Sequence, residues 1–431
     1  MQAKLTGPEE QALAVKPTTN PEAYDAYLRG LAYALRPGYY EHNVLAAVEH
    51  FSKAVELDPK FAIAWAWLAR VSALGYFNSA GNDVAALRET AKDAVAKVIQ
   101  LQPNLGEAFL AQGYFQYFCE QNYDAAIASF EKARQSAPKT GDALEALALV
   151  SRRKGEWQQS LEYFRQAIEI DPRNTSLLAS YGETYAELRE YPSALKVYDQ
   201  LLEISPDNVE ALVSKAAIYQ CAANLSEAAT LLSRVPADPS SPETFVVQIW
   251  QRIYERRFPD AIAMVKDAIA DRNLPSSAKR YYGWTLADLK AFTGDTTGAR
   301  TALQQLRDEG ESSRRQLKEE WFSFDVLAEA NAALGDQRKA LAIVDQVKVD
   351  ALNVGGLAYL RARIVLYAGD NDSAIEQLAI AAHNPVPGGP GHSATYGDLK
   401  LNPAWDPLRG DPRFEKIVAS LAPKESAAAA K

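Results

Sequence analysis

The sequence predicts an all-α solenoid, an array of helical hairpins. Between residues 47 and 206, five short runs follow one pattern of small, large apolar, small or apolar, and proline positions. Within each run these positions follow one another after four, three and five residues. Successive prolines at 138, 172 and 206 are 34 residues apart, which is the period of a repeated two-helix unit. The chain has 431 residues and is 48% hydrophobic, which suits an array that grows by adding repeats.

These runs predict the second helices of five hairpins, each ended by a proline that cannot donate to the helical ladder. The runs are Ala47-Phe51-Ala54-Pro59, Ala91-Val95-Val98-Pro103, Ala126-Phe130-Ala133-Pro138, Ser160-Phe164-Ala167-Pro172 and Ala194-Tyr198-Leu201-Pro206. Before the first run, Asn20-Pro21-Glu22 predicts a helix start, with Asn20 as N-cap, a proline in the first turn and an acid near the positive end of the helix.

The second half of the chain keeps the spacing but loses the prolines. Gly-Asp pairs at 294–295, 335–336 and 369–370 fit a helix stop followed by a turn. With these instances the sequence predicts about ten helical hairpins. The instances are Ala228-Leu232-Val235, Ala261-Val265-Ala268, Ala299-Leu303-Leu306, Ala340-Val344-Val347 and Ala374-Leu378-Ala381.

The best-formed unit spans residues 173–206. Gly182 and Ala194 are small where two helices would touch, whereas Tyr185 and Tyr198 are large enough to fill the space between repeats. This unit resembles the tetratricopeptide repeat consensus, and the resemblance extends over residues 21–382. It implies a right-handed superhelical solenoid in which the first helix of each repeat lines a concave groove.

Both chain ends are similar to the C-terminal tetratricopeptide region of bacterial TolB-like regulators linked to winged-helix or cyclase domains. The similar stretches are residues 5–30 and 401–414, and none of those upstream domains is found in this sequence. We divide the chain into an N-terminal lead-in (1–20), the solenoid (21–382), a Pro/Gly-rich loop (383–397), a C-terminal cap (398–422) and a tail (423–431). In the cap, Trp405, Leu408 and Phe414 are expected to cover the last repeat.

Charge and composition argue against several classes of function. The net charge of −9 argues against a general nucleic-acid surface, so no nucleic-acid partner is expected. No apolar run is long enough for membrane insertion, and residues 1–10 lack the apolar core of a signal peptide. We therefore expect a cytoplasmic protein as the sequence is written, with a periplasmic or extracellular location left open for a fragment or processed chain. Cys119 and Cys221 are expected to be free buried thiols.

No catalytic or metal-binding pattern is found. The four histidines, His42, His50, His383 and His392, lack the spacing of a helical metal site and are expected to be ordinary surface or core residues. The Gly-rich stretch 387–391 lacks the lysine of a phosphate-binding loop. We expect no cofactor and no metal, and an enzyme is the weakest of three functional interpretations.

The candidate partner-binding residues come from the predicted groove and one edge. Tyrosine and arginine are enriched at binding hot spots, although each of these aromatic residues could equally pack between helices. Insertions at 37–43 and 74–82 fall between the two helices of the first and second repeats, where longer helices are the alternative. The candidates are Tyr27, Tyr39, Tyr40, Arg70, Tyr76, Phe77, Tyr114, Tyr117, Arg152, Glu183 and Gln220.

Two functions follow. The first is a non-enzymatic module for protein interaction or signal sensing that binds a peptide or partner protein on its groove. The alternative is a structural protein that self-associates, stacking head to tail into a filament or oligomer.

Overall fold

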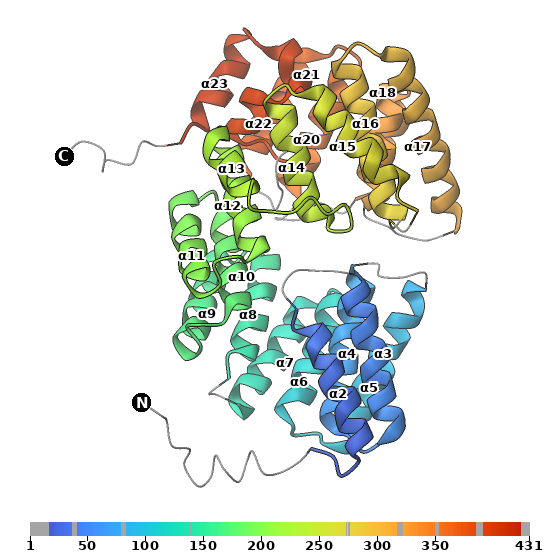
Figure 1. Cartoon of the computed structure of the whole chain (residues 1–431), viewed down its shortest axis with the longest axis vertical. Coiled ribbons are helices and arrows are strands. Elements are labelled where there is room, and N and C mark those ends of the chain that lie inside the picture. Colours follow the sequence, from blue (N-terminus) through green and yellow to red (C-terminus); the bar gives the residue numbers. More distant parts are fainter. Residues whose placement is uncertain are drawn as a thin grey trace, which may run out of the picture. The chain divides into compact units, whose positions relative to one another are not determined.

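A computed structural model describes residues 17–36, 41–78, 83–137, 140–272, 274, 276–316, 322–347, 349, 353–384 and 391–423. Throughout these ranges the regular structure is helical (Figure 1). The chain forms two compact units, unit 1 (Met1–Leu177) and unit 2 (Leu178–Lys431), with the boundary inside helix α10 (Thr175–Glu187). Each unit is considered separately below.

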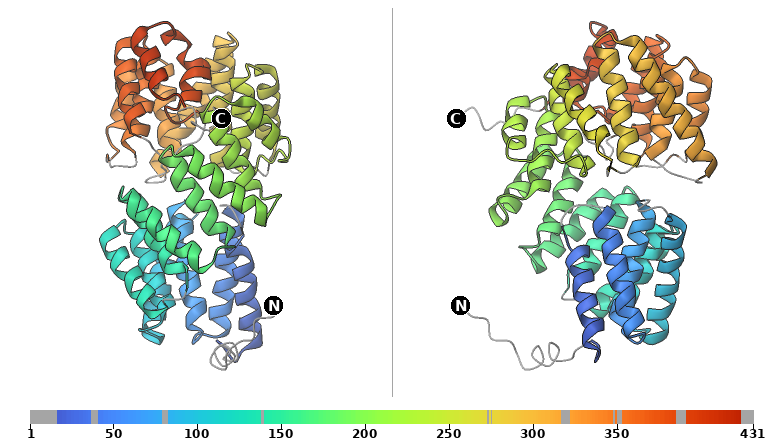
Figure 2. Two further views of the ribbon diagram at one scale, coloured as in Figure 1. Left: turned by 90° about the vertical axis from the view of Figure 1, so that its left-hand side faces the viewer. Right: turned by 45° about the vertical axis from the view of Figure 1, so that its right-hand side comes forward.

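Unit 1 is built from four consecutive helical hairpins, and its helices lie side by side (Figure 2). They are α2 (Pro21–Ala34), α3 (Glu41–Leu57), α4 (Ala62–Phe77), α5 (Val84–Leu101), α6 (Gly106–Phe118), α7 (Tyr123–Ser136), α8 (Asp142–Arg153) and α9 (Trp157–Ile170).

In unit 2 the hairpins continue from α10 and are followed by three short helices. The helices are α11 (Tyr191–Ile204), α12 (Val209–Cys221), α13 (Leu225–Leu232), α14 (Pro242–Tyr254), α15 (Phe258–Ala270), α16 (Ser276–Phe292), α17 (Thr296–Gln316), α18 (Phe322–Ala333), α19 (Gln337–Val344), α20 (Val354–Leu366), α21 (Asn371–His383), α22 (Tyr396–Leu401), the 3-10 helix η1 (Pro403–Leu408) and α23 (Pro412–Ser420).

From α2 to α21 the described helices pair into ten hairpins, which confirms the predicted all-α solenoid. Within each unit the first helices of successive hairpins also contact one another. Examples are the contacts of α4 with α6, of α12 with α14 and of α18 with α20. The first helices therefore share one face, which we call the first-helix face of each unit.

Local signals begin and end the helices as the sequence predicts. The side chain of Asn20 accepts hydrogen bonds from the backbone N–H groups of Glu22 and Ala23, which confirms it as the N-cap of α2. Gly294, Gly335 and Gly369 have φ of +83°, +96° and +76°, a left-handed conformation in which glycine carries no steric penalty.

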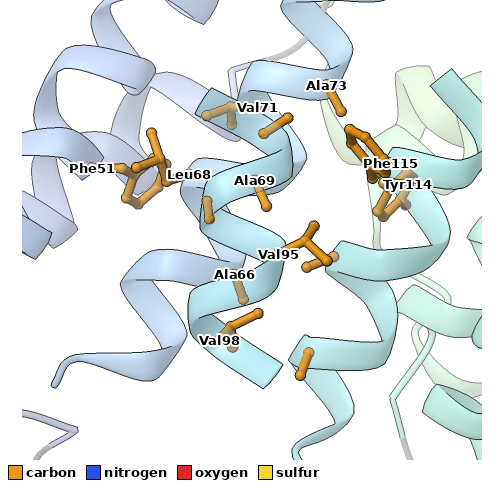
Figure 3. Close-up of a cluster of buried hydrophobic side chains, with 14 of the residues drawn as sticks. Phe51, Ala66, Leu68, Ala69, Val71, Ala73, Val95, Val98, Tyr114 and Phe115 are labelled. Atoms are coloured by element: carbon orange, nitrogen blue, oxygen red, sulfur yellow. The ribbon is translucent and has the colours of Figure 1, made fainter. Parts of the chain in front are cut away.

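Within hairpins, a glycine of the first helix faces an aromatic ring of the second. A Cβ added at Gly30 would lie 2.7 Å from Phe51, and one added at Gly182 would lie 2.8 Å from Tyr198. The sequence assigned Tyr198 to the space between repeats, but its ring also packs on the glycine of its own hairpin. In the unit 1 core, the small side chains of α4 lie between Phe51 on one side and Phe115 on the other (Figure 3).

The last three helices pack against the final hairpin. Trp405, Leu408 and Phe414 are at most 1% exposed and belong to one apolar cluster with residues of α20 and α21. The predicted loop at 383–397 lies partly outside the described residues, and α22 begins within it at Tyr396. That residues 398–422 act as a cap on which stability depends stays a prediction.

Cys119 and Cys221 are free and buried, as predicted. Among the described residues, none of the helices combines the length and the apolar character that a membrane span requires.

Candidate functional site

Arg70 of α4 lies near polar groups of the two following first helices of unit 1, α6 and α8. Its guanidinium carbon is 4.8 Å from the ring centroid of Trp67 and 4.6 Å from that of Tyr114, so the cation stacks on two aromatic rings. The side chain is half-buried. No hydrogen bond or ion pair joins it to another described residue. Burial acts to lower its pKa, but Tyr114 and the negative charges of Glu145 and Asp142 raise it.

Glu145 and Tyr114 also carry polar atoms without a partner. Burial raises the pKa of the Glu145 carboxyl, whose side chain forms no hydrogen bond with a described residue. The Tyr114 hydroxyl is buried and has no hydrogen-bond partner among the described residues. Three neighbouring first helices, α4, α6 and α8, thus each contribute a polar group with unused hydrogen-bonding capacity.

The tyrosines predicted to line the groove on α6 are packed inside unit 1. Tyr114 is 2% exposed and Tyr117 is 5% exposed. The Tyr114 ring stands edge-on to Phe130 with centroids 5.1 Å apart, and its position on α6 is shown in Figure 3. In this conformation neither residue offers a contact surface, which is the packed alternative that the sequence left open.

The predicted edge residues separate into two groups. Phe77 lies in the last turn of α4, where its ring is 5.0 Å from Phe118 and 5.3 Å from the guanidinium carbon of Arg153. Tyr76 is half-buried in the same turn. Residues 74–77 of the second insertion therefore belong to α4. Tyr39 and Tyr40 lie outside the described residues.

The remaining candidates are dispersed. Tyr27 is half-buried with its ring 5.0 Å from Phe61, and burial raises its pKa to about 12. Arg152 is half-buried and Glu183 is exposed. Gln220 is fully buried and donates hydrogen bonds to the Val247 carbonyl and the Gln251 side chain, both at 2.9 Å, so it joins α12 to α14. Partner binding by any of these residues stays a prediction.

On the first-helix face of unit 2 lies a segment of the chain itself. We call residues 391–411 the closing segment. It contacts α12 through Gly397, α14 through Gly391, and α16 through His392, whose Nε2 is 2.8 Å from the Tyr281 hydroxyl. The Tyr359 hydroxyl of α20 donates to one of two nearby acceptors, the Gly391 carbonyl at 3.1 Å or Asp398 Oδ2 at 2.9 Å.

Asp398 is the most enclosed acid of the closing segment, with no exposed surface. It accepts hydrogen bonds from the Tyr254 hydroxyl, the Trp405 indole and the Asn402 amide, each at 3.0 Å. Burial raises its pKa, while these hydrogen bonds lower it. Among the described residues, no lysine or arginine forms an ion pair with it.

Beside the closing segment, Arg363 of α20 holds two carboxylates of neighbouring first helices. One guanidinium nitrogen lies 2.7 Å from Asp288 of α16 and 2.9 Å from Glu329 of α18. Burial raises the pKa of Glu329 to about 7, although Arg363 lowers it. All three side chains are at most 9% exposed, so the cluster is a buried ion network.

Sequence reasoning did not find Asp398 or the residues that bind the closing segment, which are Tyr254, Tyr359 and Arg189, whose guanidinium donates to the Ala394 carbonyl at 2.9 Å. The signal available was the dense 401–414 motif, which was interpreted as a cap and not as a segment bound by distant helices. Within the described ranges, no three His, Cys, Asp or Glu side chains gather closely enough to hold a metal ion.

Comparison with known proteins supports the repeat assignment. Residues 120–175 match the tetratricopeptide repeat family model, and the chain contains tetratricopeptide repeats. No curated protein matches the chain. No comparison confirms the resemblance of the chain ends to TolB-like regulators.

The solved structures to which the chain is similar include the following three. The pilF protein of Pseudomonas aeruginosa is 24% identical, with 54% of this chain and 99% of that one covered and a TM-score of 0.36. A thermophilic tetratricopeptide-repeat protein of Thermus thermophilus is 18% identical, with 46% and 98% covered and a TM-score of 0.38. PilW, a widely conserved type IV pilus biogenesis factor, is 15% identical, with 53% and 100% covered and a TM-score of 0.40.

Proposed function

We propose that this tetratricopeptide-repeat chain is a non-enzymatic protein-interaction module that binds a peptide or partner protein on the first-helix face of unit 1. The fold supports a protein-interaction or scaffold role, and tetratricopeptide-repeat proteins are typically non-catalytic. The net charge of −9 favours a protein partner over nucleic acid.

The observation that carries the proposal is the pair of half-buried polar side chains of Arg70 and Glu145, neither of which forms a hydrogen bond with a described residue. Polar groups that are partly removed from water gain more from a hydrogen bond than fully hydrated groups do. A partner that supplies an acceptor to Arg70 and a donor to Glu145 would form such hydrogen bonds with side chains that use no described partner of their own. The flat faces of Trp67 and Tyr114 hold the guanidinium in place beforehand, which reduces the entropy lost when the partner docks.

Unit 2 is the weaker candidate for the same role. Its first-helix face is contacted by the closing segment at α12, α14, α16 and α20, so a partner would first have to displace that segment. We therefore assign partner binding to unit 1.

The test is affinity capture from cells that naturally make the protein, using the wild-type chain and Arg70→Ala, followed by calorimetry with the purified partner. We expect one partner to be captured by wild type and its affinity to fall at least about tenfold, or about 1.4 kcal/mol, in Arg70→Ala. The matched control is Lys92→Ala on the exposed side of α5, which should bind like wild type.

A partner that binds Arg70→Ala and wild type equally would contradict the assignment to unit 1. Light scattering of the chain without a partner tests the alternative function, head-to-tail self-association. Concentration-dependent growth into long assemblies would favour head-to-tail self-association over binding of a different protein.

A further inference from the structure

The closing segment is held in the way that a protein holds a bound peptide. Side chains of α14, of α20 and of the turn between α10 and α11 bind its main-chain atoms. The Gly391 N–H donates to the Tyr254 hydroxyl at 3.1 Å, and one guanidinium nitrogen of Arg189 donates to the Ala394 carbonyl at 2.9 Å. Because residues 391–395 are not helical, their main-chain groups have few local partners and use these side chains instead.

Two positions of the segment accept only glycine. A Cβ at residue 397 would overlap the Gln220 carbonyl oxygen of α12, and a Cβ at residue 391 would overlap the Trp250 ring of α14. Gly391 also has φ of +82°. The close approach of the backbone to two first helices therefore selects the sequence that can lie there.

One side chain adds a specific polar anchor. The Asp398 carboxylate accepts a hydrogen bond from the Tyr254 hydroxyl of α14 and lies 2.9 Å from the Tyr359 hydroxyl of α20. Residues 254 and 359 are far apart in the sequence. Both tyrosines are at most 4% exposed. A carboxylate enclosed without a paired cation is stable only when such donors are already positioned.

We propose that the first-helix face of unit 2 is a sequence-specific peptide-binding site whose resident ligand is the chain's own closing segment. The site recognises a peptide with a non-helical stretch at residues 391–395 followed by the short helix α22, with glycine at the positions of residues 391 and 397 and an aspartate at the position of residue 398. This site is separate from the face of unit 1 proposed above to bind a partner.

The test uses the full-length chain and a labelled synthetic peptide of residues 391–411. The variant Gly397→Val should expel the resident segment, since its side chain would overlap α12. Fluorescence anisotropy should show the peptide binding this variant at least about tenfold more tightly than wild type, whose site is already occupied. A peptide with Asp398→Ala should bind at least about tenfold more weakly than the natural peptide. The matched control is Lys400→Val, an exposed position of α22, which should behave like wild type.

A second variant serves if Gly397→Val does not fold. The double change Tyr254→Phe and Tyr359→Phe keeps both rings and removes the two hydroxyls at Asp398. Hydrogen exchange should then accelerate in residues 391–402 while α14 to α17 stay protected. If exchange rises equally in the segment and in those helices, the segment is an ordinary part of the core and the proposal is wrong. A folded Gly397→Val chain that binds no peptide would also overturn it.

Discussion

The ring of Tyr198 lies directly against the backbone of Gly182, so that a Cβ on residue 182 would stand 2.8 Å from Cζ of the tyrosine. Tyr198 is 2% exposed, and its ring has little room to move away. This contact sets how closely α10 and α11 approach, and the same relationship joins Gly30 to Phe51 in the first hairpin.

Gly182→Ala is therefore expected to destabilise the chain by about 1–2 kcal/mol in urea unfolding. Overpacking typically costs about 1–3 kcal/mol, and the better helix propensity of alanine returns up to about 1 kcal/mol. Gly106→Ala is the control, because a Cβ there would meet its nearest atom at an ordinary 3.6 Å. Equal effects of the two substitutions would show that the ring contact does not limit helix spacing.

Tyr114 allows its ring and its hydroxyl to be tested separately. Because the ring is buried, Tyr114→Ala is expected to cost about 3–5 kcal/mol of stability. Tyr114→Phe removes only a hydroxyl that has no described partner, so its unfolding free energy should match wild type or exceed it. A clear loss of stability in Tyr114→Phe would mean that the hydroxyl is hydrogen-bonded in solution.

Arg363→Met should leave Asp288 and Glu329 as buried acids without their cation. Breaking such a pair costs about 3–5 kcal/mol. Without Arg363 the pKa of Glu329 should rise above its present value of about 7, so the folded state binds a proton more readily than the unfolded state. Stability of the variant then falls as pH rises, and its deficit should be larger at pH 8 than at pH 5.

The control for that measurement is Arg361→Met. Arg361 pairs with Asp345 at 2.9 Å in a far more exposed setting, where one pair contributes about 0–1 kcal/mol. Thermal unfolding at the two pH values compares both variants. A deficit of Arg363→Met that is the same at both pH values would show that Glu329 does not take up a proton in the variant.

His392 is expected to make the stability of the chain fall as the pH falls, which is opposite in sign to the effect expected of Glu329. Burial, and then the charge of Arg363, lower its pKa to about 4, whereas the unfolded chain should titrate near its ordinary value of about 6.5. Its contribution to stability is complete above pH 6.5 and is lost as pH falls toward 4, because only the unfolded state then gains the proton.

When the pH falls from 8 to 5, the free energy of unfolding should therefore decrease by about 1–2 kcal/mol less in His392→Gln than in wild type. Asp325, whose pKa is raised to about 6 by burial, opposes the histidine but is present in both chains. Urea unfolding at both pH values provides the comparison. Parallel loss in the two chains would mean that His392 protonates freely in the folded protein.

The sequence by itself determined the repeat array. Periodic small and large residues, capping residues such as Asn20 and the Gly-Asp turns act locally, within one hairpin or one turn, so their meaning can be found without the fold. For the same reason about ten hairpins could be counted in advance. The prediction that Tyr114 and Tyr117 line an open groove could not rest on such local signals, because the exposure of a side chain depends on the neighbouring repeats.

Only the tertiary structure decided the route of the closing segment. Asp398 lies 144 residues from Tyr254 and 39 from Tyr359, and no periodic pattern links them. Gly391 and Gly397 are ordinary loop glycines until Trp250 and Gln220 are placed beside them. Such contacts join helices that are distant in the chain, and their partners are determined only when the superhelical path of unit 2 brings those helices together.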